Sequence, residues 1–407
     1  MAATIAAVTP YLKEVYRGKI IDQLQSEVIA LKRITRSSAG VTNETNGKYV
    51  TFPIHTRRNS GVGSRLENEA LPVPGQQGHA AARVALKYGY GGLQITGQAI
   101  SLSDTDTKAF AQAISTEVNG LKEDVKKDMN RQVYGTGNGA IGTVQTSGGP
   151  FNAFVVTDAK LFQLDEVVDI VTLPSTVAVT NRIVTGINLT TNTITLSGAA
   201  FSVTAGQIVT RVGSGPHASA GNREITGLAG IVSTSDVFNI AVSAEPEWQS
   251  YINANGGTPR ALSEGLMGRV VDEVRVRGGK TTLILQSLGV RRSYANLLLQ
   301  TKSTVNTQEF RGGFKGLAFD TDGDSGTIPV IADPDAPLNK QWYLNEDTFT
   351  YFRDRDWDWM DRDGNMWKQV RDTNGDYDAY YARLVEYHEL GCNRRNSNAR
   401  LDDIIES

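Results

Sequence analysis

The feature that most constrains this chain is a long polar ribbon that runs directly into one long amphipathic helix, together residues 49–134. The ribbon has strand-like apolar ends at 49–54 and 83–88, and the stretch between them offers few residues that could form a core. A two-stranded excursion of this kind is marginally stable in water unless it lies against another surface. We therefore expect it to lie on another copy of the same chain, as in an assembly subunit and not in a compact enzyme.

The helix expected over residues 107–134 has a narrow apolar stripe along one face. Its apolar residues recur every three or four positions: Phe110, Ile114, Val118, Leu121, Val125, Met129 and Val133. At the rise of an α-helix it would be about 42 Å long. Acidic and hydroxyl side chains at 104–106 can cap its start, and the Gly-rich run from Gly135 ends it. A second amphipathic helix is expected at 9–34, with Pro10 at its first position.

The tip of the ribbon, residues 57–75, mixes charges of both signs: Arg57, Arg58, Arg65, Glu67 and Glu69. One interpretation is a solvated loop. The other is a docking strip whose charges pair across the boundary between two subunits. The long helix that follows favours the second interpretation, so these five residues are the expected intersubunit contacts.

The rest of the chain changes character twice. Residues 150–245 hold short β-branched runs separated by Gly, Asn and Ser, which indicates an antiparallel β module that could close into a small barrel. The turn at 191–192 indicates a hairpin within it. Residues 260–301 have an α/β pattern with helices at 262–276 and 288–299 around a buried strand at 281–285, and a long late strand is expected at 378–390.

Composition excludes several classes of protein. The net charge is −3, whereas a sequence-independent DNA-binding protein normally has a strong excess of basic residues. A face without such an excess can still lie near packaged DNA, because salt screens charges beyond about 10 Å. The one cysteine, Cys392, excludes an intramolecular disulfide and a multi-cysteine zinc site. We find no signal peptide and no apolar window long enough to span a membrane, and therefore expect an aqueous compartment.

Three motifs partly match known ligand-binding sequences or their like, but none meets the requirements of a nucleotide-binding or calcium-binding site. Gly137-x-Gly139-x-x-Gly142 matches a dinucleotide-binding fingerprint but follows a helix instead of a strand, so we interpret it as a helix stop. The acidic turn Asp320–Asp324 resembles the start of a calcium loop, but the Gly and Glu that such a loop needs are absent. A less specific cation site at this turn remains an alternative to a plain acidic turn. Asp372–Asp376 is better interpreted as a hairpin turn.

We find no nucleophile and general base at a spacing that would let them act together in catalysis. Cys392 and His388 lie in a strand-like segment, where their side chains would be about 13 Å apart. The sequence gives no positive case for an enzyme, and we assign no catalytic, cofactor-binding or metal-binding residue.

The order of these parts resembles the major capsid proteins of tailed bacteriophages, a fold shared with encapsulins. The most specific segments are 203–207, 223–228, 328–333 and 342–345. The resemblance implies an α+β fold with peripheral and axial domains. Its expected divisions are an N-terminal arm (1–48), an extended two-stranded loop (49–103), a peripheral domain with the spine helix (104–164), a β-rich insertion (165–255), an axial domain (256–345) and a return to the peripheral domain with a C-terminal tail (346–407).

The implied function is self-assembly into hexamers and pentamers of an icosahedral shell around double-stranded phage DNA, formed in the host cytoplasm. Implied partners are other copies of the chain, a separate scaffolding protein, a portal, a decoration protein and non-specifically held DNA, with no membrane and no cofactor. Residues 55–82 contain no lysine, so we expect a non-covalent shell. The alternatives are an encapsulin-like compartment, a β-rich binding protein and a hydrolase with an unrecognised pair of acids.

Overall fold

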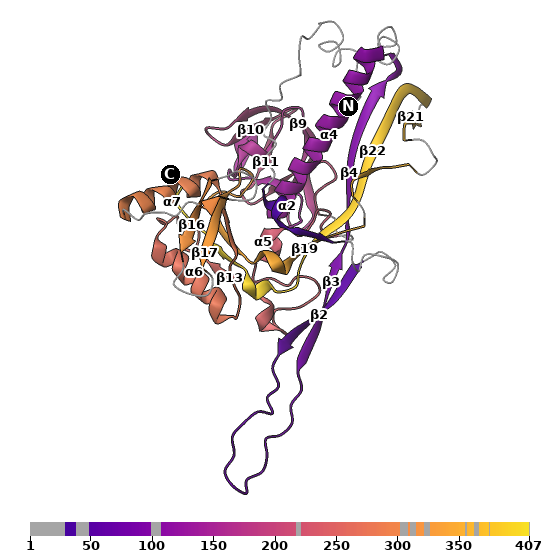
Figure 1. Ribbon diagram of the computed structural model, residues 1–407. Helices are drawn as coiled ribbons and strands as arrows, with labels where there is room; N and C mark the ends of the chain where they lie inside the picture. The colour runs from indigo at the N-terminus through magenta and orange to yellow at the C-terminus, as the bar shows by residue number, and fades with distance from the viewer. Residues whose placement is uncertain are drawn as a thin grey trace.

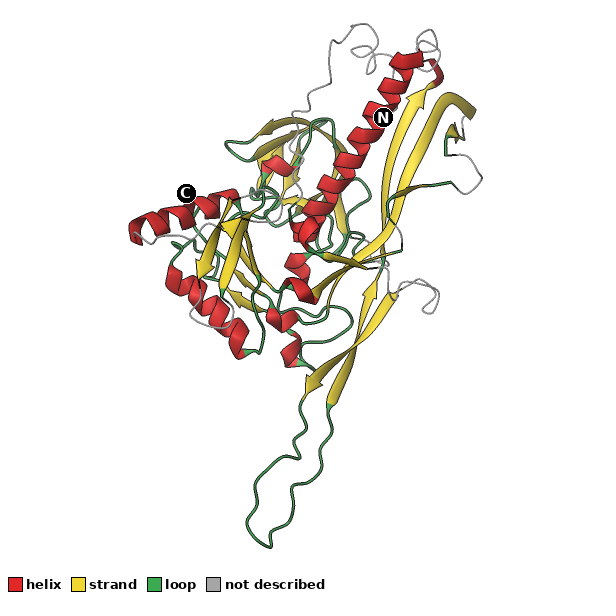
Figure 2. Cartoon of the chain, viewed as in Figure 1, coloured by secondary structure: helices red, strands yellow, loops and turns green. Residues whose placement is uncertain are grey.

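The computed structural model describes residues 29–37, 49–98, 107–216, 221–301, 308–309, 315–320, 326–354, 356–361, 366–373 and 375–406. Over these ranges the chain is an α+β body from which one narrow ribbon projects (Figure 1). Helices and strands are intermixed along the body, and the outer end of the projection is drawn as loop (Figure 2). The α+β class expected from the sequence is confirmed.

A long helix and two long strands form one side of the body (Figure 1). The helix α4 (Thr107–Tyr134) lies along β4 (Lys87–Thr96), which pairs antiparallel with β22 (Gly375–Cys392). Glycines in β4 let the strand approach the helix, because a Cβ at Gly91 would lie 3.0 Å from a Val125 methyl carbon. Three short strands and one turn-forming strand complete this sheet: β1 (Thr35–Ser37), β19 (Phe349–Arg353), β20 (Asp358–Trp359) and β21 (Lys368–Asp372).

The helix predicted over 107–134 and the hairpin turn predicted at 372–376 are both confirmed, the latter by the pairing of Asp372 with Gly375. Of the N-terminal helix predicted at 9–34, residues 9–28 lie outside the described residues. The described part is α2 (Ala30–Arg33), which ends one residue before the expected position. The backbone N–H of Ala30 donates to buried Asp333, so α2 is fixed to the body at its start.

A six-stranded sheet forms a separate small barrel. Its strands run in the order β5 (Ala140–Thr143), β12 (Ile208–Arg211), β8 (Val167–Thr172), β9 (Thr176–Asn188), β10 (Thr193–Leu196) and β7 (Ala153–Val155). A bridge between Val144 and Val156 joins the two outer strands and closes the sheet. A further pair, β6 (Gly148–Phe151) and β11 (Phe201–Val203), lies beside it. The barrel and the hairpin at 191–192 are therefore as predicted.

The barrel boundaries differ from those expected for the β-rich insertion. Its first strand begins at Ala140 instead of 165, and its last described strand ends at Arg211. Residues after it, including α5 (Leu228–Ile231) and the short helix η3 (Pro246–Trp248), pack into the main core instead. The sequence could not separate the two, because short β-branched runs occur on both sides of each boundary.

A seven-stranded sheet with two helices forms the other part of the body. Its order is β13 (Tyr251–Asn253), β23 (Ala399–Leu401), β18 (Gln341–Leu344), β14 (Leu283–Gln286), β17 (Thr327–Ala332), β16 (Lys315–Asp320) and β15 (Gln308–Glu309). The predicted helices are α6 (Glu264–Val276) and α7 (Leu288–Thr301). Because β23 pairs with β13 and β18, the segment 346–407 does not return wholly to the sheet beside α4 as expected.

Candidate assembly surface

The projecting ribbon consists of β2 (Tyr49–Arg57) and β3 (Gly78–Ala85), which among the described strands pair only with each other. Its base is anchored in the main core through Val50, Ala82 and Val84, all buried. The backbone N–H of Arg83 also donates to the Phe238 carbonyl oxygen over 2.9 Å. The ring of Phe52 in β2 also stacks on Phe352 of β19, so the paired part of the ribbon packs on the body without joining a strand ladder of its sheets.

The tip, defined as residues 58–77, continues beyond the paired strands without a helix or strand of its own. Large apolar side chains on it are almost fully exposed: Val62 (87 %), Leu66 (77 %), Leu71 (83 %) and Val73 (83 %). Exposed apolar residues gathered on one segment indicate a surface that another molecule covers. Sequence reasoning missed these four residues because they follow neither a helical nor a strand period.

The charged residues predicted as intersubunit contacts lie at the end of β2 and on the tip. Arg57 differs from the other four because it forms an ion pair with the body of its own chain: its Nη2 donates to Glu245 Oε1 over 3.0 Å. Arg65 donates to the carbonyl oxygens of Ser64 and Ala70, and Glu69 accepts from the Leu66 N–H, so this pair shapes a turn within the tip. Pairing of Arg58, Arg65, Glu67 and Glu69 across two copies stays a prediction.

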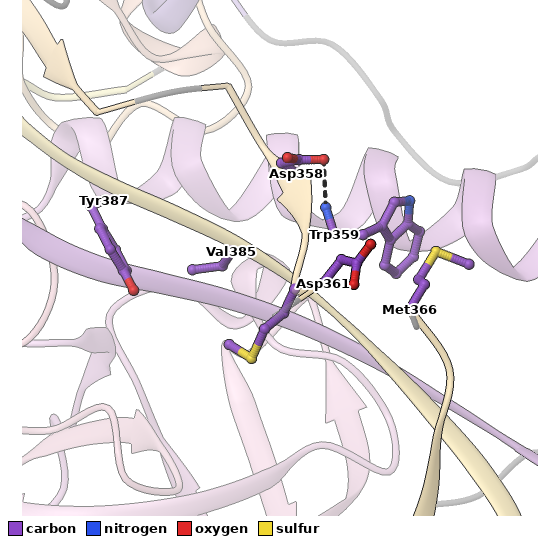
Figure 3. Close-up of a pocket in the computed structure, with 7 residues that line it drawn as sticks. Asp358, Trp359, Asp361, Met366, Val385 and Tyr387 are labelled. Atoms are coloured by element: carbon purple, nitrogen blue, oxygen red, sulfur yellow. Dashed lines mark hydrogen bonds between the residues drawn. The ribbon is translucent and has the colours of Figure 1, made fainter. Parts of the chain in front are cut away.

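An acidic and aromatic groove opens beside β20 and β22 (Figure 3). It has a volume of about 530 Å³ and is lined by Asp358, Trp359, Met360, Asp361, Met366, Val385 and Tyr387. The Asp358 carboxylate accepts from the backbone N–H of Trp359, and the Asp361 carboxylate is exposed at the groove. Its two rings and two carboxylates are complementary to the exposed aliphatic residues and the two arginines of the tip, which also carries Glu67 and Glu69.

A buried network of charges joins α4 to the barrel. The Arg131 guanidinium bonds to Asp128 on its own helix and to Glu224, while Arg211 of the barrel bonds to Asp128 and Glu166. Burial alone raises the pKa of Asp128, but Arg131 and Arg211 outweigh it and lower that pKa to about 2. The barrel is therefore held against the long helix by fixed, ionised groups.

The other candidate sites give no further chemistry within the described residues. No group of three His, Cys, Asp or Glu side chains gathers there as a metal site. Residues 321–325 of the acidic turn lie outside the described residues, so the question of a cation site there is not tested. Gly137 and Gly139 both have positive φ and follow the end of α4, as the helix-stop interpretation requires. No described helix could cross a membrane.

No protein-family model and no curated protein matches the sequence. Solved structures do match over nearly the whole chain. A chain of the cyanophage A-1(L) capsid asymmetric unit aligns with a TM-score of 0.56 at 16 % identity, covering 97 % of this chain and 99 % of that one. A structure from Mycobacterium phage Bobi aligns at 0.48 with 11 % identity over 100 % of both chains. An encapsulin of Synechococcus elongatus aligns at 0.46 with 8 % identity, covering 98 % of this chain and 95 % of that one.

The similarity to the cyanophage capsid chain extends across the ribbon, the long helix and both parts of the body, because it covers almost all of each chain. Identity at this level establishes the fold and not the activity. The resemblance read from the order of parts in the sequence is confirmed: the chain has the capsid fold of tailed bacteriophages.

Proposed function

We propose that this chain is a major capsid protein, which assembles with copies of itself into hexamers and pentamers of an icosahedral shell around double-stranded phage DNA. The role is structural and not catalytic. The observation that supports it best is the ribbon with its uncovered tip, on a subunit whose fold is that of a phage shell protein. A segment without its own core is stabilised when a neighbouring subunit covers it.

We further propose that the surface covering the tip is the acidic and aromatic groove of a neighbouring subunit. The exposed aliphatic side chains of the tip fit its rings, and Arg58 and Arg65 are opposite in charge to Asp358 and Asp361. Each exposed pair contributes only about 0–1 kcal/mol, so the shell depends on repetition of the contact around a closed assembly.

Purified particles test the proposal directly. Electron microscopy of the expressed protein is expected to show closed shells, and particles from infected cells are expected to hold nuclease-protected DNA and a portal. Shells packed with an enzyme instead of DNA would favour the encapsulin-like compartment. A protein that stays monomeric at high concentration would contradict a shell function altogether. Scaffolding and decoration proteins would appear as further bands in immature and mature particles.

The docking role of the tip is tested separately by reversing two charges, Arg58→Glu together with Arg65→Glu. We expect fewer shells and an unchanged helical circular dichroism signal, because neither residue contributes to the core. The matched control, Arg58→Lys with Arg65→Lys, keeps both charges and should assemble normally. Normal shells from the reversed variant would reject the docking role of these arginines while leaving the shell function standing.

A further inference from the structure

The contact between Arg57 and Glu245 lies at the boundary between the fixed and the free part of the projection. Arg57 is the last residue of β2, and its partner across the ribbon is Gly78, the first residue of β3. The tip begins at the next residue. A contact at this point fixes the direction in which the tip leaves the body, because residues beyond it have no strand pairing.

The Glu245 end of this contact is buried in the body. Its side chain is 10 % exposed, whereas that of Arg57 is 68 % exposed. The second carboxylate oxygen, Oε2, is buried with no hydrogen-bond partner among the described residues. A buried carboxylate that loses its cation is strongly unfavourable, which distinguishes this pair from an ordinary surface ion pair.

The ribbon is shaped so that Arg57 reaches Glu245. The pairing of β2 with β3 shifts between His55 and Arg57, which leaves Thr56 as an extra residue. A bulge of this kind bends a strand and changes the direction of the next side chain. Opposite Arg57 stands Gly78, where a Cβ would lie 2.7 Å from the Arg57 Cβ and 2.9 Å from its Nε. A larger residue at 78 would displace the arginine.

We infer that Arg57 and Glu245 form a latch within one subunit, which presets the direction of the tip before a second copy binds. Arg57, which the sequence placed among the intersubunit contacts, then has a positioning role inside its own chain. A tip held in its docking direction loses less conformational freedom on assembly, which favours assembly without adding a contact. The value of the latch for assembly rests on the proposed function, whereas its existence in the subunit does not.

Hydrogen exchange on unassembled subunits tests the latch independently of any shell. In Arg57→Gln and in Glu245→Gln, exchange of the β2 and β3 amides, including the Arg83 N–H, should increase about tenfold, since the outer anchor of the ribbon is lost. The charge-swapped pair, Arg57→Glu with Glu245→Arg, should restore most of the protection. The matched control, Arg58→Gln, removes the neighbouring arginine and should change nothing in the ribbon.

Assembly rates distinguish the latch from a contact between subunits. If the latch exists, Arg57→Gln and Glu245→Gln slow shell formation to the same extent, and the double variant is no slower than either. Unchanged exchange in both single variants, or slower assembly in Arg57→Gln alone, would overturn the latch and return Arg57 to the subunit boundary. If Glu245→Gln does not fold, the exposed Arg57→Gln carries the test. If the unmodified chain forms no shells, the proposed function fails and the exchange result still decides on the latch.

Discussion

The barrel and the ribbon are both built from antiparallel strands, but they differ in what happens to the unpaired edges of their outer strands. The barrel joins its outer strands through Val144 and Val156 and encloses its own apolar core. The ribbon has two strands, both with an open edge, and its tip exposes its largest apolar side chains. The first is complete within one chain, whereas the second leaves its edges and its tip open, and under the proposed function a neighbouring subunit covers them. The unfolding stability of the single subunit should therefore depend on the barrel and hardly at all on the tip.

The largest expected effect on subunit stability comes from the barrel core. Phe154 is 2 % exposed and makes an edge-to-face contact with Phe201. Phe154→Ala should lower the free energy of unfolding by about 3–5 kcal/mol, because it leaves a cavity in a closed core. Urea denaturation followed by fluorescence and circular dichroism measures the loss. A loss below about 1 kcal/mol would show that the barrel does not depend on its own core.

The connection between the barrel and α4 should give the next effect. Arg131→Gln leaves the carboxylates of Asp128 and Glu224 without this shared, buried partner. We expect a loss of about 3 kcal/mol and a separate, earlier transition for the barrel in thermal unfolding. Lys126→Gln on the same helix is the control, since its pair with Glu123 is exposed and should contribute less than about 0.5 kcal/mol. Equal effects in the two variants would refute a coupling role for Arg131.

A pH-dependent effect on stability is expected in β22. Burial raises the pKa of Glu389 to about 8 from 4.5, against the opposing influence of Lys87 and of the Thr226 and Leu390 N–H groups. The folded state therefore holds this proton more tightly than the unfolded state, and stability falls as the pH rises from about 4.5 to about 8. Glu389→Gln should reduce this slope, measured by denaturation across the same range. An unchanged slope would assign the pH dependence to other groups.

The smallest effect on the subunit is expected at the tip. Leu66→Ser with Leu71→Ser changes two exposed side chains, so the free energy of unfolding should stay within about 0.5 kcal/mol of the unchanged chain. Shell formation, followed by light scattering, should be strongly reduced because the apolar contact with the neighbour is lost. A destabilised subunit would mean that the tip folds back on its own body, and the contrast with the barrel would fail.

The sequence predicted the elements whose pattern is local. The apolar stripe from Phe110 to Val133 predicted α4, and the turn at 191–192 predicted the hairpin of β9 and β10. It could not predict partners distant in the chain: the bond from Arg57 to Glu245, the bridge of Val144 with Val156, or the insertion of β23 between β13 and β18. These depend on tertiary packing, which periodicity does not encode. The apolar residues of the tip were missed for a related reason, since their spacing follows no helical or strand period.

The position of β23 has a consequence for how the chain folds during translation. This strand, late in the chain, pairs with β13 on one side and β18 on the other, and Ala399 and Leu401 are fully buried there. The seven-stranded sheet therefore lacks the strand between β13 and β18 until residues 399–401 have left the ribosome. The projecting ribbon is translated long before. The ribbon can therefore form early in synthesis, whereas the seven-stranded sheet cannot be completed until the last residues of the chain have emerged.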